Sequence, residues 1–253
     1  MIKRPSFEFD RRKLLVLAAG GLAASAAMSA PFAAFAQANG EAPLKIATIG
    51  AGREGGALGT LFARQGHPVM FSSLHPEQLK DLVASAGPTA QAGTVEQAIE
   101  FGDVVLLVVP YTAVEQIGKD HGQALTAKQL VIDVSNPIAR RDGDAIVKWV
   151  SEQGGAGLAT AKLLPGAHLV RGFNAINYLK LTEDAHRQGE PVGVPIASDD
   201  PKALALATQL IKEIGFEPVP VGGLAMGKYL VPGTPLGGEH TPTEIRQIVA
   251  TLK

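Results

Sequence analysis

The feature that most constrains this chain is a glycine-rich turn between an apolar strand and a helical segment. Residues 45–49 form the expected strand, and Gly50-Ala51-Gly52-Arg53-Glu54-Gly55 follows it directly. In a G-x-G-x-x-G turn the first glycine permits a tight bend, the second lets the backbone approach a pyrophosphate, and the third allows close helix–strand packing. An apolar pattern of helical period then continues to Gln65. The motif in this context predicts a dinucleotide-binding site, with the phosphates at a helix N-terminus.

The rest of the chain alternates strands and helices, as an α/β fold requires. The run from Asp103 to Val109 contains six consecutive Val or Leu residues, which is typical of a strand buried on both faces of a parallel sheet. The other expected strands are residues 69–72, 130–134, 168–173, 192–197 and 217–221. The expected helices are residues 76–85, 94–101, 113–125, 142–164 (broken at Gly154-Gly155), 201–214 and 241–253. We therefore predict a doubly wound, mostly parallel sheet of Rossmann type.

The first 36 residues have a different character from the rest. They contain five basic and two acidic residues, a net charge of +3, and residues 14–36 carry no charge. The segment ends in Ala34-Phe35-Ala36, which resembles a signal-peptide cleavage site, and Asp10-Arg11-Arg12-Lys13-Leu14-Leu15 resembles the twin-arginine export signal. The alternative is a membrane anchor, because 23 uncharged residues are long enough to span a bilayer.

These observations define an expected organisation. Residues 1–36 are a twin-arginine-type signal, residues 37–43 a linker, residues 44–228 the NAD(P)-binding domain, and residues 229–253 a tail with a short helix. The precursor is expected to engage the twin-arginine export machinery and to reach the periplasm. After cleavage no stable membrane insertion is expected, whereas an uncleaved signal would anchor the protein.

Composition excludes several kinds of site. The chain has no cysteine, so disulfides, cysteine-ligated zinc and iron–sulfur clusters are excluded. The six histidines are scattered without metal-ligand spacing, and no metal site is predicted. The net charge of -1 gives no basic footprint for nucleic acid. No acid/base dyad and no nucleophile elbow is found.

The end of the second strand determines which dinucleotide is expected. An Asp or Glu at that position would hold the ribose diol of NAD. The chain instead reads Phe71-Ser72-Ser73-Leu74-His75, in which Ser72, Ser73 and His75 can donate hydrogen bonds to a 2′-phosphate. NADP is therefore favoured over NAD. The expected cofactor-binding residues are Gly50, Gly52, Arg53, Glu54, Gly55, Ser72, Ser73, His75, Pro110 and Asn136.

A second group of candidates follows the buried strands. Ligands of open parallel sheets lie outside the carboxyl ends of the strands. Pro110, Tyr111, Asn136, Phe173 and Asn174 occupy those positions and are expected to line a nicotinamide and acceptor pocket, where the two amides hold the carboxamide or the acceptor ring. The alternatives are chain reversal at the proline, core packing of Phe173 and turn capping by the asparagines. The neighbouring Asp133 is expected to be structural.

A series of segments in fixed order resembles a known family. They are Ile49–Gln65, Val108–Tyr111, Ile132–Pro137, Val170–Ile176, Pro195–Asp200 and Ile214–Val219. Together they resemble the NADPH-dependent coenzyme F420 (8-hydroxy-5-deazaflavin) reductase family over residues 44–228. The resemblance implies a dinucleotide sheet extended by two strands. It also implies hydride transfer between NADPH and a small flat acceptor, which could be deazaflavin, flavin or a metal chelate.

Three functions therefore stay open at this point. The first is an NADP-dependent oxidoreductase that brings two rings together without an acid/base dyad. The second is a non-catalytic or structural nucleotide-binding protein of the same fold. The third is an imine reductase related to pyrroline-5-carboxylate reductase. A homodimer is left open as well.

Overall fold

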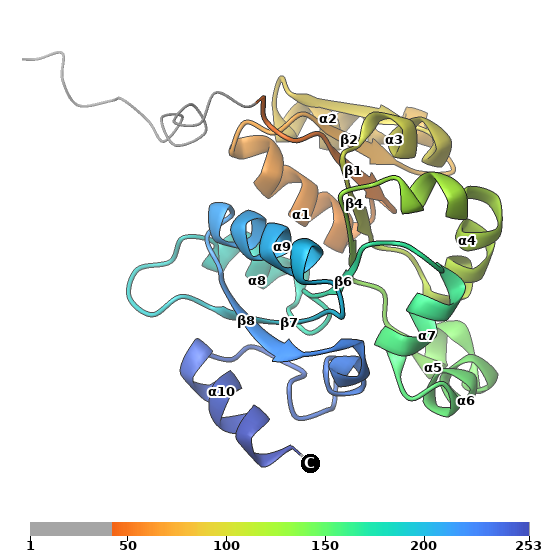
Figure 1. Cartoon of the computed structure of the whole chain (residues 1–253). Helices are drawn as coiled ribbons and strands as arrows, with labels where there is room; N and C mark the ends of the chain where they lie inside the picture. The colour runs from red at the N-terminus through yellow and green to blue at the C-terminus, as the bar shows by residue number, and fades with distance from the viewer. Residues whose placement is uncertain (1–41, 253) are drawn as a thin grey trace, which may run out of the picture. The chain divides into compact units, whose positions relative to one another are not determined.

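An eight-stranded sheet is the framework of residues 42–252, the part of the chain that the computed structural model describes (Figure 1). The strand order is β3-β2-β1-β4-β5-β6-β7-β8. The strands are β1 (Ile46–Ile49), β2 (Val69–Ser72), β3 (Ala90–Gly93), β4 (Val104–Leu107), β5 (Leu130–Asp133), β6 (Leu169–Arg171), β7 (Gly193–Ala197) and β8 (Glu217–Gly222). Neighbouring strands pair in parallel except β6 and β7, which are antiparallel. The predicted doubly wound sheet with two further strands is confirmed. The export signal expected at residues 1–36 lies outside the described residues.

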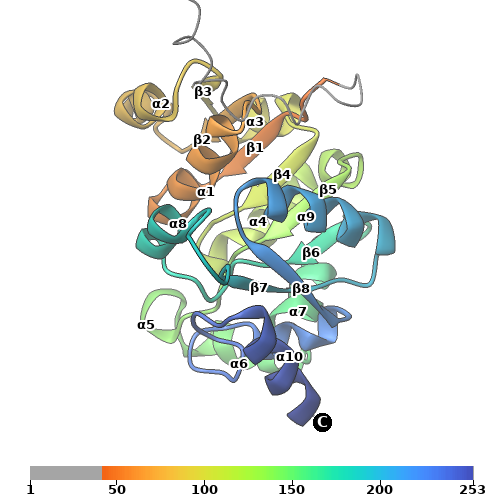
Figure 2. The ribbon, with the colours of Figure 1, turned by 90° about the vertical axis from the view of Figure 1, so that its left-hand side faces the viewer.

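Helices cover both faces of this sheet (Figure 2). One face packs against α1 (Arg53–Arg64), α2 (Lys80–Ala86), α8 (Tyr178–Asp184) and α9 (Pro201–Glu213). The other packs against α3 (Val95–Phe101), α4 (Tyr111–Thr126), α6 (Asp144–Glu152) and α7 (Ala156–Leu163). The short helices η1 (Pro76–Leu79), α5 (Ala139–Asp142) and η2 (Leu224–Tyr229) connect these elements. No helix among residues 42–252 is both long and apolar enough to cross a membrane.

Burial on both faces explains the apolar runs in the strands. Val104 and Leu106 of β4 belong to the core cluster on one face, and Val105 and Leu107 belong to the cluster on the other. All four side chains are fully buried. Each buried aliphatic side chain of this size contributes about 1.5–3 kcal/mol through the hydrophobic effect. The core is therefore two apolar layers that share one sheet.

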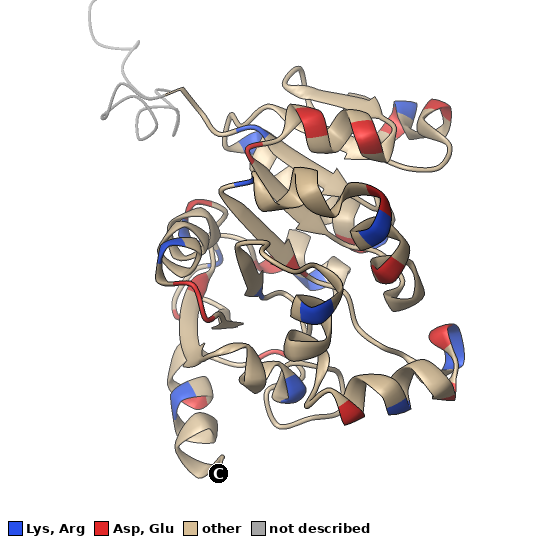
Figure 3. Ribbon diagram, turned by 45° about the vertical axis from the view of Figure 1, so that its right-hand side comes forward, with Lys and Arg blue, Asp and Glu red and all other residues tan. Residues whose placement is uncertain are grey.

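Charged side chains are interspersed on the outer helices (Figure 3). Lys119–Glu115 and Lys148–Glu152 form ion pairs one helical turn apart, and all four side chains are largely exposed. Pairs of this kind stabilise a helix by only about 0.3–0.5 kcal/mol each. Apolar burial, and not surface charge, therefore dominates the stability of these layers.

Four elements were not predicted, namely β3, α5, α8 and η2. In β3 and α8 the usual sequence signals are missing. The edge strand β3 is Ala-Gln-Ala-Gly, without β-branched residues, and it forms through parallel pairing with β2. Helix α8 is short and begins at Asn177, whose side chain accepts a hydrogen bond from the backbone N–H of Leu179. The other predicted elements are present within a few residues. Asp200 caps α9 as expected, accepting hydrogen bonds from the N–H groups of Lys202 and Ala203.

The C-terminal segment extends the fold beyond β8. The predicted capping box is present: Thr241 and Glu244 exchange side-chain to backbone hydrogen bonds at the start of α10 (Pro242–Thr251). Ile245 of this helix is fully buried in a cluster with Val219 and Val221 of β8. His240 also forms a bridge to Gly193 at the start of β7. Residues 229–252 therefore cover the end of the sheet formed by β7 and β8.

Candidate functional site

The glycine turn lies where the strand order reverses, between β1 and β4. Gly50 has a φ of 93°, and a Cβ on it would lie 2.2 Å from the carbonyl oxygen of Val108. A Cβ on Gly55 would lie 2.1 Å from the carbonyl oxygen of Gly50. Both positions therefore exclude any side chain, as the motif predicts. The crevice at such a reversal is where open α/β sheets bind their ligands.

Gly52 differs from the other two glycines because the space around it is open. It precedes the first turn of α1, and a Cβ on it would meet no atom within 4 Å. Because Gly52 has no side chain to cap the helix, the first backbone N–H groups of α1 are left for an external acceptor. Three glycines that shape a turn and an open helix N-terminus fit a pyrophosphate.

The residues after β2 only partly match the prediction for a 2′-phosphate site. The prediction for Ser72 is wrong: its side chain is fully buried, and its hydroxyl donates a 2.9 Å hydrogen bond to the carbonyl oxygen of Thr48. Ser73 and His75 lie in the loop beyond the strand, where the Ser73 hydroxyl accepts from the His75 N–H. The His75 ring is exposed and lies 3.3 Å from a carboxylate oxygen of Glu77. Two of the three predicted donors therefore face outward.

The residues after β4 also divide into two kinds. Pro110 is exposed and directly precedes α4. Tyr111 is 2% exposed, and its hydroxyl lies 3.1 Å from Oγ1 of Thr160 on α7. Burial raises the pKa of this phenol to about 12. The pocket role predicted for Tyr111 is wrong, because the ring points into the helix layer.

A buried ion pair joins the ends of β5 and β6. Asp133 and Arg171 are partners in the parallel register, and Nη1 of Arg171 donates a 2.7 Å hydrogen bond to Oδ2 of Asp133. Both side chains are fully buried. The same Nη1 donates to the carbonyl oxygen of Ser135, whose N–H donates to Oδ1 of Asp133. Asp133 is structural as expected, and Arg171 is a site residue that the sequence reasoning missed.

The ion pair also orients the two candidate amides. Nη2 of Arg171 donates a 2.8 Å hydrogen bond to Oδ1 of Asn136, and Nδ2 of Asn136 donates to the carbonyl oxygen of Asn174. Nδ2 of Asn174 donates to the carbonyl oxygens of Asp133 and Ser135. These bonds leave one N–H of Asn136 for a ligand. The buried Oδ1 of Asn174 has no hydrogen-bond partner among residues 42–252. Such an orphaned acceptor is costly unless a ligand supplies a donor.

Phe173 belongs to the core and does not line a pocket. Its side chain is 2% exposed and packs edge-on against Phe216, with ring centroids 5.8 Å apart. The expected pocket role for Phe173 is therefore wrong. Its φ is 62°, a conformation that costs a bulky residue roughly 1–3 kcal/mol. This left-handed backbone conformation turns the chain, so that the Phe173 ring enters the core while the Asn174 side chain bonds to the end of β5.

The two charged residues of the glycine turn lie near the N-terminus of α8. The guanidinium of Arg53 lies 5.6 Å from the centre of the Tyr178 ring. The carboxyl group of Glu54 accepts a hydrogen bond from the Tyr178 backbone, and burial raises its pKa to about 7. The segment from Asn174 to Tyr178 thus links the amide cluster to the glycine turn.

A second arginine, Arg141, fastens the segment after β5 and was also missed from the sequence. Its guanidinium donates to the backbone oxygen of Asn136 and forms an ion pair with Asp142 at 2.8 Å. The buried Asp142 accepts from the Ile138 N–H, and the Arg141 contact helps to hold its pKa below the ordinary value. No sequence signal marked either arginine, because an arginine is read as a surface charge until its partners are known.

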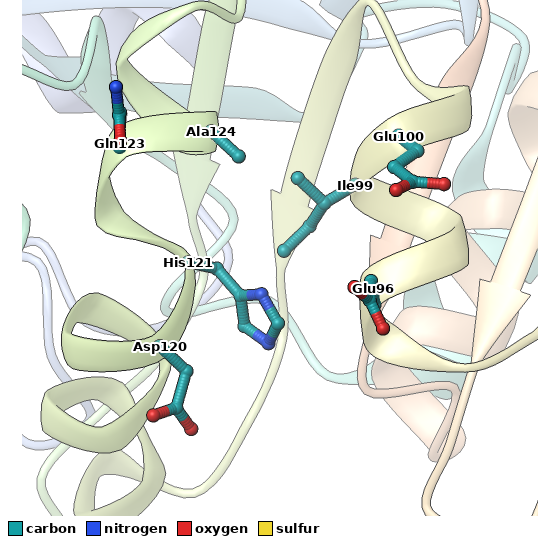
Figure 4. A pocket seen from close by; sticks show the side chains of 7 residues that line it. All are labelled: Glu96, Ile99, Glu100, Asp120, His121, Gln123 and Ala124. Carbon is teal, nitrogen blue, oxygen red and sulfur yellow. The ribbon is translucent and has the colours of Figure 1, made fainter.

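The structure also has a hollow between α3 and α4 that lies away from this edge. It has a volume of about 360 Å³ and includes Glu96, Glu100, Asp120 and His121 among its lining residues (Figure 4). The two helices end there, just before β4 and β5 begin, so the hollow lies toward the amino edge of the parallel strands. Among residues 42–252 no three His, Asp or Glu side chains are placed to hold a metal ion.

The fold and the glycine turn together are those of a Rossmann-type dinucleotide-binding domain. The sequence match is more specific. Residues 45–137 match the family described as NADP oxidoreductase, coenzyme F420-dependent. The match covers this part of the chain, and the resemblance predicted from the sequence is confirmed there.

Curated relatives also match part of the chain. Glycerol-3-phosphate dehydrogenase [NAD(P)+] of Staphylococcus epidermidis is 27% identical over 131 residues, which cover 45% of this chain and 39% of that protein. The enzyme of Enterococcus faecalis is 27% identical over 121 residues. The chain therefore spans about two fifths of the length of the curated relatives it matches.

Solved structures match over more of the chain. A hypothetical protein from Sinorhizobium meliloti is 26% identical, with a TM-score of 0.65 over 77% of this chain and 93% of its own. An Arthrobacter sp. FB24 protein, assigned as an F420-dependent NADP-reductase, is 17% identical with a TM-score of 0.58 over 73% and 87%. An imine reductase from Myxococcus stipitatus in complex with NADP+ has a TM-score of 0.51 at 18% identity, over 72% and 56%. The last two likenesses show the fold alone.

We predict that Gly52→Asp abolishes dinucleotide binding without unfolding the protein. The new Cβ meets nothing, so the fold tolerates it, but the carboxylate would repel a pyrophosphate. Fluorescence titration with NADPH measures the affinity, and circular dichroism measures the fold. Gly122→Asp on α4, where an added Cβ also meets no atom within 4 Å, is the matched control and keeps the affinity. A Gly52→Asp protein that binds as the wild type does would contradict the placement of the pyrophosphate.

We predict that Arg171→Met lowers the free energy of unfolding by about 3–5 kcal/mol, because it leaves the Asp133 carboxylate buried without its partner. Urea unfolding measures the change. Adding Asp133→Asn to this variant restores part of the loss, since the buried charge is then removed. Lys119→Met, which breaks an exposed ion pair, is the control and shifts stability by less than about 1 kcal/mol. If Arg171→Met and Lys119→Met lowered the free energy of unfolding equally, the buried pair would contribute no more to stability than an exposed one.

Proposed function

We propose that this protein is an NADP-dependent oxidoreductase that transfers a hydride between NADPH and a small flat acceptor. The observation that carries the proposal is the position of the oriented Asn136 and Asn174 amides on the same strand edge as the glycine turn. The family description and the two glycerol-3-phosphate dehydrogenases support the nucleotide and the reaction class. Bound NADPH supplies the hydride.

In this proposal the protein holds the two reactants and excludes water. Asn136 has one N–H free to donate, and Asn174 has one buried acceptor, so together they match the oxygen and the amino group of a carboxamide. Arg171 fixes the Asn136 amide and keeps its oxygen from turning toward the ligand. The acceptor is deazaflavin, a flavin or a metal chelate, because hydride transfer to a flat ring needs alignment more than it needs an acid or base.

NADP is proposed over NAD because residues 73–76, which directly follow β2, contain no acidic side chain. Ser73 and His75 can donate to a 2′-phosphate from the loop that β2 ends in. The preference rests on these two residues alone, since Ser72 is committed to the Thr48 carbonyl. The proposal therefore includes a measurable preference for NADPH over NADH.

The test is to mix the purified protein with NADPH or NADH and with deazaflavin, flavin mononucleotide or a ferric chelate. We expect NADPH-dependent reduction of at least one acceptor. In Asn136→Ala we expect a turnover at least tenfold lower, as the loss of one hydrogen bond of about 1.4 kcal/mol would produce. Gln91→Ala, an exposed position on β3, is the control. Nucleotide binding without reduction of any acceptor would support a non-catalytic role and would overturn the enzyme proposal.

We also propose that the precursor is exported through the twin-arginine machinery to the periplasm. Support comes from the basic start, the uncharged stretch and the Ala34-Phe35-Ala36 end. Replacing Arg11 and Arg12 together by lysine should keep the protein in the cytoplasmic fraction at precursor size, whereas the wild type is periplasmic and about 36 residues shorter. Lys3→Arg is the control. Wild-type protein of full length in the membrane fraction would indicate an anchor instead.

A further inference from the structure

Glu54 is a buried carboxyl group in the turn proposed to hold the pyrophosphate. It is the second residue of α1, directly after Gly52 and Arg53. Its Oε1 atom is buried and has no hydrogen-bond partner among residues 42–252. The one hydrogen bond to the carboxyl group comes from the backbone of Tyr178 at the start of α8. Helices α1 and α8 are in contact, and Figure 2 shows them side by side.

An acidic side chain in the first turn of a helix is normally stabilised in its charged form. Here burial outweighs that effect and raises the pKa of Glu54 to about 7, against which the Tyr178 hydrogen bond acts only weakly. Among residues 42–252 no cation contributes to this shift, and the Arg53 guanidinium lies over the Tyr178 ring. The remaining ionisable side chains on the packed helices are Lys80 and Asp81 on α2 and Lys180, Glu183 and Asp184 on α8. None of these contributes to the shift.

We propose that the glycine turn binds the dinucleotide together with one proton, which Glu54 takes up. A pyrophosphate on the first N–H groups of α1 and a charged Glu54 would share one helical turn of about 5.4 Å. Two negative groups at that distance repel each other strongly in a partly buried site. The proton comes from solvent and forms an O–H bond on the carboxylate, and no other bond changes. Neutral Glu54 therefore accompanies the bound state, and the inference rests on the proposed nucleotide site.

The direction of the pH effect follows from the coupling between proton uptake by Glu54 and nucleotide binding. Below about pH 7 Glu54 is already neutral, and binding needs no proton uptake. Above that pH the free protein must take up a proton, so the affinity falls by up to tenfold for each pH unit. The same burial makes the free protein less stable as the pH rises through the folded-state pKa. Glu54→Gln, which is uncharged at every pH, removes both effects.

The experiment compares dissociation constants of NADPH for wild type and Glu54→Gln between pH 6 and pH 8.5, by fluorescence titration. The ratio of the two constants is the readout, since titration of the 2′-phosphate is common to both proteins. We expect a ratio near one at pH 6 and a wild-type affinity about tenfold weaker than that of the variant at pH 8. Calorimetry in two buffers of different ionisation enthalpy should show proton uptake at pH 8 for the wild type only.

Glu96→Gln is the matched control, because Glu96 is an exposed glutamate in the first turn of α3. It should leave the pH profile unchanged. A constant ratio between pH 6 and pH 8.5, or equal proton uptake by both proteins, would overturn the inference while leaving nucleotide binding intact. Failure of both proteins to bind NADPH at any pH would instead overturn the proposed function. Thermal unfolding of the free proteins gives a second measure: the wild type should lose stability between pH 6 and pH 8.5, and Glu54→Gln should not.

Discussion

The packing around the glycine turn depends on the absence of a Cβ atom at two positions, Gly50 and Gly55. Gly50 and Gly55 let the end of β1, the start of α1 and the backbone after β4 meet at distances that no side chain would permit. This close approach brings the first N–H groups of α1 to the point where the strand order reverses. The open position at Gly52 then lets an anion reach them. One steric constraint therefore sets both the packing of the first helix and the place of the ligand.

The opposite side of the site depends on a buried charge. Arg171 is fully buried at the end of β6, and its guanidinium serves Asp133, Ser135 and Asn136 together. A buried ion pair adds little net stability compared with an apolar pair of the same shape. Its effect here is geometric: it fixes the Asn136 amide, and through it the turn at Asn174. The positive φ of Phe173 also fixes the position of Asn174. It directs the Phe173 ring into the core and the Asn174 amide toward the end of β5.

The match to the known family covers only part of the candidate site. Residues 45–137, which include the glycine turn and Asn136, match the F420-dependent NADP oxidoreductase family, and the glycerol-3-phosphate dehydrogenases are matched over a similar length. Arg171 and Asn174 lie outside that family match. Nucleotide binding is thus supported by sequence and fold together. The proposed acceptor class rests on the geometry of the two amides.

The sequence by itself determined the parallel sheet, the glycine turn and the helix caps at Asp200 and Thr241, because each depends on local patterns or on residues a few positions apart. It did not determine which side chains of the predicted site face a ligand. Ser72, Tyr111 and Phe173 stand at the expected strand ends but point into the protein, and Arg171 gave no signal. Burial of a side chain depends on residues far away in the chain, such as Thr160 for Tyr111 and Phe216 for Phe173. Only the tertiary structure could bring those partners together, and with them the buried, unpartnered carboxyl of Glu54.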